Sequence, residues 1–198
     1  LHLAHREKAM RGRLLYAWAQ TLLFFGRNAA ALSAFRQVVE QDPAHEEAWS
    51  VIGFLEAERG AISEAIPAFE RALALRPNDA ALCFNAAFAL QKAGEHERAM
   101  PLLTRAIGLD PKLDRAWYGL GLSLAHVGRY EEAIVQFREA ARLQPLNPYA
   151  GYQLAAAFFK LGRREELEKE YARIKLFDPK VSAIMRRDFG IHDPDVTL

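Results

Sequence analysis

Residues 114–147 read DRAWYGLGLSLAHVGRYEEAIVQFREAARLQPLN, and this stretch of 34 residues decides the fold of the chain. Apolar residues step at helical spacing on both sides of Gly128, which predicts two amphipathic helices. Gly128 suits the left-handed residue that commonly ends a helix, and Pro145 closes the second helix because proline cannot continue one. The unit is therefore helix, tight turn, helix, loop.

The same unit recurs along the chain at a fixed period of 34 residues. The two columns that show it most clearly are Gly26, Gly60, Gly94, Gly128 and Gly162, and Pro43, Pro77, Pro111, Pro145 and Pro179. A column of small residues runs beside them: Ala19, Gly53, Ala87, Gly121 and Ala155. A fixed period of this kind is typical of a solenoid. It predicts one architectural domain of five repeats, at 12–45, 46–79, 80–113, 114–147 and 148–181.

The residues outside the five repeats are expected to form the two ends of the repeat array. Residues 1–11 continue the register only in part, which predicts an N-terminal helical cap or the end of a preceding repeat. The chain begins with Leu1 rather than Met, which leaves open that a segment or a further domain precedes it. Residues 182–198 are expected to form a short helix and a tail, with Ile191 and Val196 able to place that tail in the chain's own groove.

Three features of the repeat columns are expected to have structural roles. Small residues let an aromatic side chain such as Phe69 or Phe137 sink into the crossing of two helices. Glu56 interrupts a column that is otherwise apolar, so it is expected to reach solvent or a cationic neighbour. Cys83 shares its column with Trp49 and is expected to be a buried thiol.

The repeat resembles the tetratricopeptide repeat (TPR), whose sequence pattern is most complete between Ala116 and Pro145. The resemblance covers 170 of 198 residues. It implies an all-α fold, a right-handed superhelical α-solenoid of antiparallel helix pairs. It also implies a concave groove, lined by the first helices, for peptides or partner helices. The family includes adaptors, scaffolds, chaperone-like proteins and targeting domains of enzymes, so the groove residues must decide the function.

The groove predicted from the repeat register is aromatic. Its candidate contacts are Tyr16, Gln20, Ser50, Phe54, Phe84, Asn85, Phe88, Lys92, Tyr118, Leu122, His126 and Tyr152. The central cluster among them is Phe54, Phe84, Phe88, Tyr118 and Leu122. An apolar stripe with a few polar neighbours suits an amphipathic helix or an extended apolar peptide.

Two binding habits of the family do not fit this groove. Members that clamp a C-terminal carboxylate carry Lys and Asn at the first two groove positions, whereas the corresponding residues of the first repeat here are Tyr16 and Gln20. Asn85 resembles the asparagine with which other members bind a peptide backbone, but its column holds no second asparagine.

Composition narrows the class of protein further. The chain has 26 basic and 25 acidic residues and a net charge of +1, which argues against a nucleic-acid partner. No apolar run is long enough to insert into a membrane. The single cysteine fits a reducing compartment, so a cytoplasmic location is expected.

No cofactor, metal or catalytic site is expected. His2 and His5 have helical spacing but no third ligand nearby, and Gly119 to Gly121 lies inside a helix without a preceding strand. The sequence thus predicts a non-enzymatic adaptor or scaffold that binds a protein or peptide partner. Two alternatives remain open: a substrate-recruiting domain of a larger enzyme such as a glycosyltransferase, and a module that assembles as a homo-oligomer.

Overall fold

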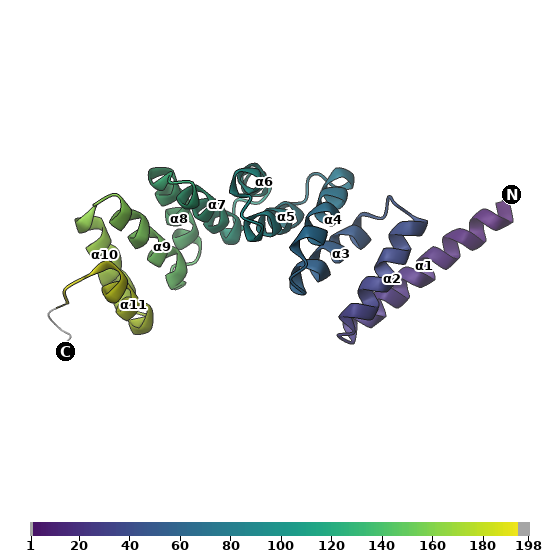
Figure 1. Ribbon diagram of the computed structural model, residues 1–198, viewed down its shortest axis with the longest axis horizontal. Helices are drawn as coiled ribbons and strands as arrows, with labels where there is room; N and C mark the ends of the chain where they lie inside the picture. The colour runs from purple at the N-terminus through teal and green to yellow at the C-terminus, as the bar shows by residue number, and fades with distance from the viewer. Residues whose placement is uncertain (1, 194–198) are drawn as a thin grey trace. The chain divides into compact units, whose positions relative to one another are not determined.

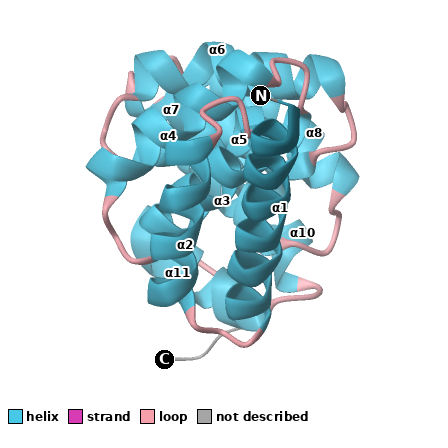
Figure 2. Cartoon of the chain, turned by 90° about the vertical axis from the view of Figure 1, so that its right-hand side faces the viewer, coloured by secondary structure: helices cyan, strands magenta, loops and turns pink. Residues whose placement is uncertain are grey.

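The computed structural model describes the backbone of residues 2–193 and the side chains of residues 10–193. Every regular element in this range is an α-helix, as Figure 2 shows, so the predicted all-α class is confirmed. The chain divides into an N-terminal unit, residues 1–95, and a C-terminal unit, residues 96–198, each described here by itself.

The helices follow one another in the order labelled in Figure 1. The N-terminal unit contains α1 (His2–Phe24), α2 (Asn28–Gln41), α3 (Glu46–Glu58), α4 (Ile62–Leu75) and α5 (Ala80–Lys92). The C-terminal unit contains α6 (His96–Leu109), α7 (Asp114–His126), α8 (Tyr130–Leu143), α9 (Pro148–Lys160), α10 (Arg164–Lys175) and α11 (Pro179–Phe189). Successive helices within each unit pack against each other, and short loops make them antiparallel.

The glycine ladder ends the first helix of every repeat. All five of its glycines have positive φ, from 68° at Gly26 to 83° at Gly60, the left-handed conformation that glycine adopts without steric cost. Around Gly26, the Gly26 N–H donates to the Leu23 carbonyl and the Arg27 N–H donates to the Leu22 carbonyl. This pair of hydrogen bonds satisfies carbonyls that the helix end leaves without intrahelical partners.

The two glycines of the small column each admit a ring from the second helix of their repeat. A Cβ placed on Gly53 would lie 2.7 Å from the Phe69 ring, and one placed on Gly121 would lie 2.5 Å from the Phe137 ring. Both rings are buried. The aromatic side chain thus rests directly on the backbone of the first helix, as the alternation of small and aromatic columns predicts.

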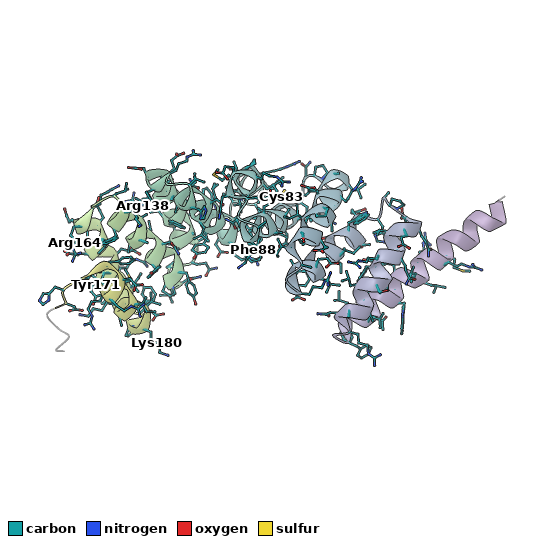
Figure 3. The ribbon with its side chains drawn as sticks, in the orientation of Figure 1. Cys83, Phe88, Arg138, Arg164, Tyr171 and Lys180 are labelled. Atoms are coloured by element: carbon teal, nitrogen blue, oxygen red, sulfur yellow. The ribbon has the colours of Figure 1, made fainter. Side chains whose placement is uncertain are left out.

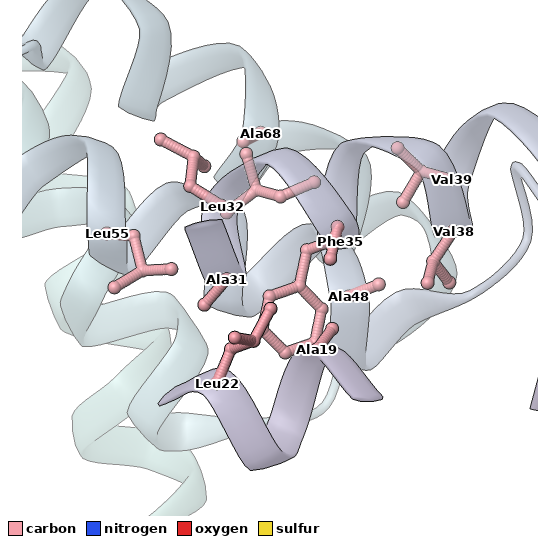
Figure 4. Close-up of a cluster of buried hydrophobic side chains, with 12 residues drawn as sticks. Ala19, Leu22, Ala31, Leu32, Phe35, Val38, Val39, Ala48, Leu55 and Ala68 are labelled. Atoms are coloured by element: carbon pink, nitrogen blue, oxygen red, sulfur yellow. The ribbon is translucent and has the colours of Figure 1, made fainter. Parts of the chain in front are cut away.

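The core of the N-terminal unit is continuous across its helices. Figure 4 shows side chains from α1, α2, α3 and α4 meeting around the ring of Phe35. Ala19 and Leu22 enter from α1, while Ala48 and Leu55 enter from α3. One core therefore joins neighbouring repeats, which is how a solenoid buries faces that a single helix pair would leave in water.

The loops before three first helices are held by side chains of one column. In each loop, a side chain donates a hydrogen bond to a proline carbonyl: Trp49 to Pro43 at 3.0 Å, Cys83 to Pro77 at 3.9 Å, and Trp117 to Pro111 at 2.9 Å. Cys83 is fully buried, as predicted. The thiol therefore occupies the position of an indole and makes a weaker version of the same contact.

The fifth repeat holds its loop from the other helix. Its residue in this column is Gly151, and a Cβ there would lie 2.7 Å from the guanidinium of Arg173 on α10. Arg173 donates to the Pro145 carbonyl at 3.1 Å and pairs with Glu170. An arginine from the second helix has thus taken the place of the first-helix tryptophan.

Helix α11 packs on α9 and α10 and ends at Gly190, which has a φ of 60°. Arg164 of α10 donates to the carbonyls of Phe189 and Gly190 at 3.1 and 3.0 Å. Beyond the helix, Asp193 is buried and accepts hydrogen bonds from Tyr171 and Lys175 of α10. Residues 191–193 therefore lie on the second helix of the last repeat, not on the first-helix face expected for the tail; Val196 lies outside the described residues.

At the other end, α1 runs without interruption from His2 into the first repeat. Residues 2–11 are thus helical and continuous with the first helix.

Glu56 is fully buried on α3, and it finds the cationic neighbours that its column position requires. Its carboxylate forms ion pairs with Arg36 of α2 and Arg59 of the following turn. The side chains of both arginines remain about half exposed, at 51% and 53%. The buried charge is therefore paired, while its partners keep contact with water.

The substitutions Gly53→Ala and Gly121→Ala are each expected to lower the free energy of unfolding by about 1 to 3 kcal/mol, because the new methyl group overlaps a buried ring. Urea unfolding followed by circular dichroism measures the change.

Gly12→Ala and Gly108→Ala are the matched controls, since a Cβ at either helical position meets no atom within 4 Å. Both should stabilise by up to about 1 kcal/mol, the usual gain of alanine over glycine inside a helix. Equal effects at all four glycines would contradict the close packing.

Removal of the two arginines and replacement of Glu56 should lower the free energy of unfolding by different amounts. Removing both arginines, Arg36→Ala with Arg59→Ala, leaves a buried carboxylate without partners and should cost about 3 to 5 kcal/mol. Glu56→Leu restores the apolar residue of the column and frees two guanidiniums that reach water, so it should change stability by less than about 1.5 kcal/mol. Urea unfolding of both variants tests this order, and a larger loss for Glu56→Leu would contradict it.

Candidate functional site

The candidate groove residues all lie on first helices of the repeats. In the N-terminal unit they are Tyr16 and Gln20 on α1, Ser50 and Phe54 on α3, and Phe84, Asn85, Phe88 and Lys92 on α5. In the C-terminal unit they are Tyr118, Leu122 and His126 on α7, and Tyr152 on α9. The expected central cluster is therefore divided, with three aromatic residues in one unit and Tyr118 with Leu122 in the other.

The aromatic residues of α3 and α5 form the most open part of this face. Phe54 is 47% exposed and Phe88 is 43% exposed, although both are large apolar side chains. Phe84 is half-buried and stacks with Phe88 at a centroid distance of 6.3 Å. Figure 3 labels Phe88 and the buried Cys83 on opposite sides of α5. Phe88 thus lies on the side of α5 turned away from the buried Cys83.

Polar groups accompany these rings on α5. The Lys92 ammonium lies 5.2 Å from the centroid of Phe88, within the range of a cation–π contact. Asn85 is half-buried one residue after Phe84, and Ser50 is half-buried on α3. An amide, a hydroxyl and a cation beside exposed rings supply both anchoring and orientation for a peptide. We name Phe54, Phe84, Phe88, Asn85 and Lys92 the aromatic face.

Tyr16 and Gln20 are engaged within the unit itself. The Tyr16 hydroxyl donates to Glu47 of α3 at 2.6 Å and accepts from Gln20, and its ring lies 4.4 Å from that of His45. Burial, followed by the hydrogen bond to the Glu47 carboxylate, raises the pKa of Tyr16 to about 12. Tyr16 is therefore a neutral donor that ties α1 to the start of α3. Glu47 and His45 are partners that the repeat columns did not reveal.

On α7, His126 stacks on a histidine from the neighbouring helix. The rings of His126 and His96 are 3.8 Å apart and nearly parallel, at 20°. His96 also lies 3.4 Å from the hydroxyl of the buried Ser123. Burial first, and then the nearby His126, lower the pKa of His96, while Glu97 acts in the opposite direction. His96 begins the second helix of its repeat, so the first-helix columns could not indicate it.

Tyr118 borders a cavity of about 190 Å³ in the C-terminal unit. The lining comes from the start of α7, the end of α8 and the start of α9, with Arg115 and Tyr149 at its rim. Burial raises the pKa of Tyr118, so its phenol stays neutral. Leu122 is half-buried one turn further along α7. Tyr149 was not among the predicted contacts although it is 65% exposed, because it lies outside the columns assigned to the groove.

Tyr152 is covered by α11. Its hydroxyl donates to Asp188 at 2.8 Å, and its ring lies 5.3 Å from the Phe189 ring. Burial, then the Asp188 carboxylate, raise the pKa of Tyr152. The terminal helix thus occupies the first-helix face of the last repeat. The sequence predicted this short helix, and Asp188 and Phe189, which contact Tyr152, lie at its end.

Metal and membrane sites are not found among the described residues. No three of their His, Cys, Asp and Glu side chains are arranged to hold a metal ion, and the side chains of His2 and His5 lie outside the described set. None of the helices in the described range combines the length and apolarity that a membrane span requires.

Comparison with known proteins identifies the family. A family model described as the cytochrome c-type biogenesis protein H TPR domain matches residues 29–150, more than half of the chain. A search of curated proteins finds no match.

Solved structures share the fold. The chain is similar to YrrB, described as a TPR protein with an unusual peptide-binding site, with a TM-score of 0.81 and 22% identity over 88% of this chain and 90% of that one. A MamA structure gives a TM-score of 0.80 and 20% identity over 92% of this chain and 97% of that one. MamA from Desulfovibrio magneticus gives a TM-score of 0.75 and 21% identity over 89% of this chain and 96% of that one. The predicted TPR fold is confirmed, and the chain belongs to the family of cytochrome c-type biogenesis protein H TPR domains.

Proposed function

We propose that the chain is an adaptor that binds a peptide or an amphipathic helix of a partner protein on the aromatic face of its N-terminal unit. The observation that carries this proposal is the exposure of Phe54 and Phe88 on the first helices of two consecutive repeats. Exposed aromatic rings on neighbouring helices, as on α3 and α5, are typical of binding sites, because aromatic side chains supply much of the affinity at interfaces.

The chemistry of the face favours a ligand with apolar anchors and a nearby acceptor. Phe84 and Phe88 are stacked and offer flat apolar surface, while Phe54 is an exposed ring on α3, a helix that contacts α5. Lys92 is exposed beside Phe88 and suits a carboxylate or a carbonyl of the ligand. Asn85 carries both a donor and an acceptor, the pair of groups that a peptide bond requires.

We propose a non-enzymatic role. The groups on the aromatic face are rings, an amide and an ammonium that already contacts a ring, and this set recognises a ligand without supplying an activated nucleophile or a general base. The peptide-binding site named for YrrB, a protein with the same fold, supports peptide recognition by such a scaffold.

The family description favours a partner from cytochrome c biogenesis. The cytoplasmic location expected from the single cysteine stays a prediction, and fractionation of cells with an antibody against the chain tests it.

The double variant Phe54→Ala with Phe88→Ala should weaken binding of the native partner by about tenfold or more, because two anchors are truncated. The measurement is recovery of partners from the native cell extract on immobilised chain, identified by mass spectrometry, followed by titration of the partner that is recovered.

The matched control is Leu75→Ala with Val135→Ala, which truncates apolar side chains of similar exposure, 42% and 53%, on second helices. This control should retain the partner. If the Phe54→Ala, Phe88→Ala variant keeps its fold by circular dichroism and binds the partner as tightly as the unsubstituted chain does, the partner binds elsewhere.

A further inference from the structure

Three first helices carry a tyrosine at the same repeat position: Tyr16 on α1, Tyr118 on α7 and Tyr152 on α9. The chain itself engages two of these tyrosines, whereas the third borders a cavity. Tyr16 and Tyr118 are held alike, since each ring lies 5.9 Å from the buried phenylalanine of its own repeat, Phe35 or Phe137. The engaged tyrosines therefore indicate what the third one can bind.

Both engaged tyrosines meet a carboxylate and a ring. On α1, the tyrosine hydroxyl donates to Glu47, and the tyrosine ring lies 4.4 Å from that of His45. On α9, the tyrosine hydroxyl donates to Asp188, and the tyrosine ring lies 5.3 Å from that of Phe189. In each case one short segment supplies both partners, which stand two residues apart before α3 and side by side in the sequence at the end of α11. The same pair of contacts thus arises from two different segments.

At Tyr118, none of the described residues supplies this second ring or this carboxylate. The position of His45 is taken by Asn147, whose side chain caps α9 by accepting from a backbone N–H at 3.0 Å. The position of Glu47 is taken by Tyr149, which is 65% exposed. Burial raises the pKa of all three tyrosines, but a carboxylate adds to this rise only at the two engaged ones.

The space beside Tyr118 is the cavity of about 190 Å³. Two buried alanines, Ala140 and Ala150, line it. The first and fifth repeats, whose tyrosines are engaged, have Val38 and Ile174 at the position of Ala140. The smaller side chain leaves room next to the phenol, where a ring of a ligand can enter.

The hydroxyl of Tyr118 keeps a proton to donate. Gln153 of α9 forms a hydrogen bond with this hydroxyl, as Gln20 does with the hydroxyl of Tyr16. A phenol oxygen that accepts from an amide still carries one O–H donor. In Tyr16 that donor is directed to a carboxylate, so a carboxylate is the group that the equivalent donor of Tyr118 suits.

The charges of the cavity lining balance each other. Arg115 and Asp114, which are consecutive in the sequence, both line it. A ligand carboxylate is therefore placed by the phenol hydroxyl and by the amides of Gln144 and Asn147, which also belong to the lining, rather than by net charge. Binding should accordingly depend only weakly on salt.

We propose that the cavity at Tyr118 binds a segment of a partner protein that carries an aspartate or a glutamate within two residues of an aromatic side chain. The carboxylate accepts the hydrogen bond of the Tyr118 hydroxyl, and the aromatic side chain enters the cavity beside the phenol ring. This site belongs to the C-terminal unit and does not depend on the aromatic face, so it is a second binding site of the chain.

The end of α11 supplies a defined probe, because Asp188 and Phe189 already bind a tyrosine of this column. The probe is a fluorescent peptide of residues 179–190, stapled between positions 180 and 184, both of which are exposed in the chain. Fluorescence anisotropy with the full chain should show saturable binding. Probes with Asp188→Asn or Phe189→Ala should bind at least about tenfold more weakly, because each lacks one of the two contacts.

The substitution Tyr118→Phe removes the hydroxyl alone and should weaken binding of the probe by about tenfold or more. Tyr152→Phe is the matched control and should bind the probe as the unsubstituted chain does, because α11 of the chain already occupies that tyrosine. If Tyr152→Phe weakens binding and Tyr118→Phe does not, the probe replaces α11 on the last repeat, and the proposal is wrong.

A second variant closes the cavity with residues of the chain itself. Asn147→His with Tyr149→Glu introduces beside Tyr118 the pair that engages the tyrosine of α1. The cap of α9 is kept, since the His45 side chain accepts from a backbone N–H at the start of α3 in the same way. This variant should keep its fold by circular dichroism and lose the probe.

No binding of the probe to the unsubstituted chain, or equal binding by Tyr118→Phe and by the Asn147→His, Tyr149→Glu variant, would overturn the proposal. Sedimentation of the chain without probe tests another occupant. A dimer that Tyr118→Phe dissociates would assign the cavity to a second copy and refute the partner protein. Because Phe54 and Phe88 are unchanged in these variants, recovery of the partner of the aromatic face should be unaffected, which keeps the two sites distinguishable.

Discussion

The contact of a phenylalanine ring with the backbone of a glycine is the constraint on which the rest of the structure depends. Phe69 packs on Gly53 and Phe137 packs on Gly121. The two helices of each repeat approach more closely than they could if a residue with a Cβ stood in place of the glycine. This approach fixes which side of the first helix is packed. Other sides of the first helices carry exposed residues such as Phe54 and Phe88.

Much of the fold could be predicted from the sequence because the residues that determine it act locally and recur in every repeat. The positive φ of Gly60 and the small residue at Gly53 follow from a pattern that occurs five times, and the buried charge of Glu56 was visible as an exception to its column. Partners outside the pattern could not be predicted. His96 meets His126, and Asp188 meets Tyr152, through contacts that no column of the ladder encodes.

The first-helix face is accordingly not uniform, and its differences arise from what covers it. Tyr16 is bound by Glu47, and Tyr152 is bound by Asp188, so two tyrosines of one column are engaged by their own chain. The phenylalanine in the same column, Phe84, has a ring neighbour on its own helix instead. The aromatic residues of one column therefore differ in what they contact, although the sequence shows them as equivalent.

The use of Arg in place of Trp in the fifth repeat has a consequence for recognising the repeat in a sequence. Arg173 reaches the Pro145 carbonyl from α10, so position 151 does not have to supply the donor, and the close approach of Glu170 and Arg173 leaves room there only for glycine. A tryptophan at position 151 and Arg173 in its present place exclude each other, because even a Cβ at 151 would overlap Glu170 and Arg173. A repeat can in this way lack its signature tryptophan and still hold its loop by the same proline carbonyl.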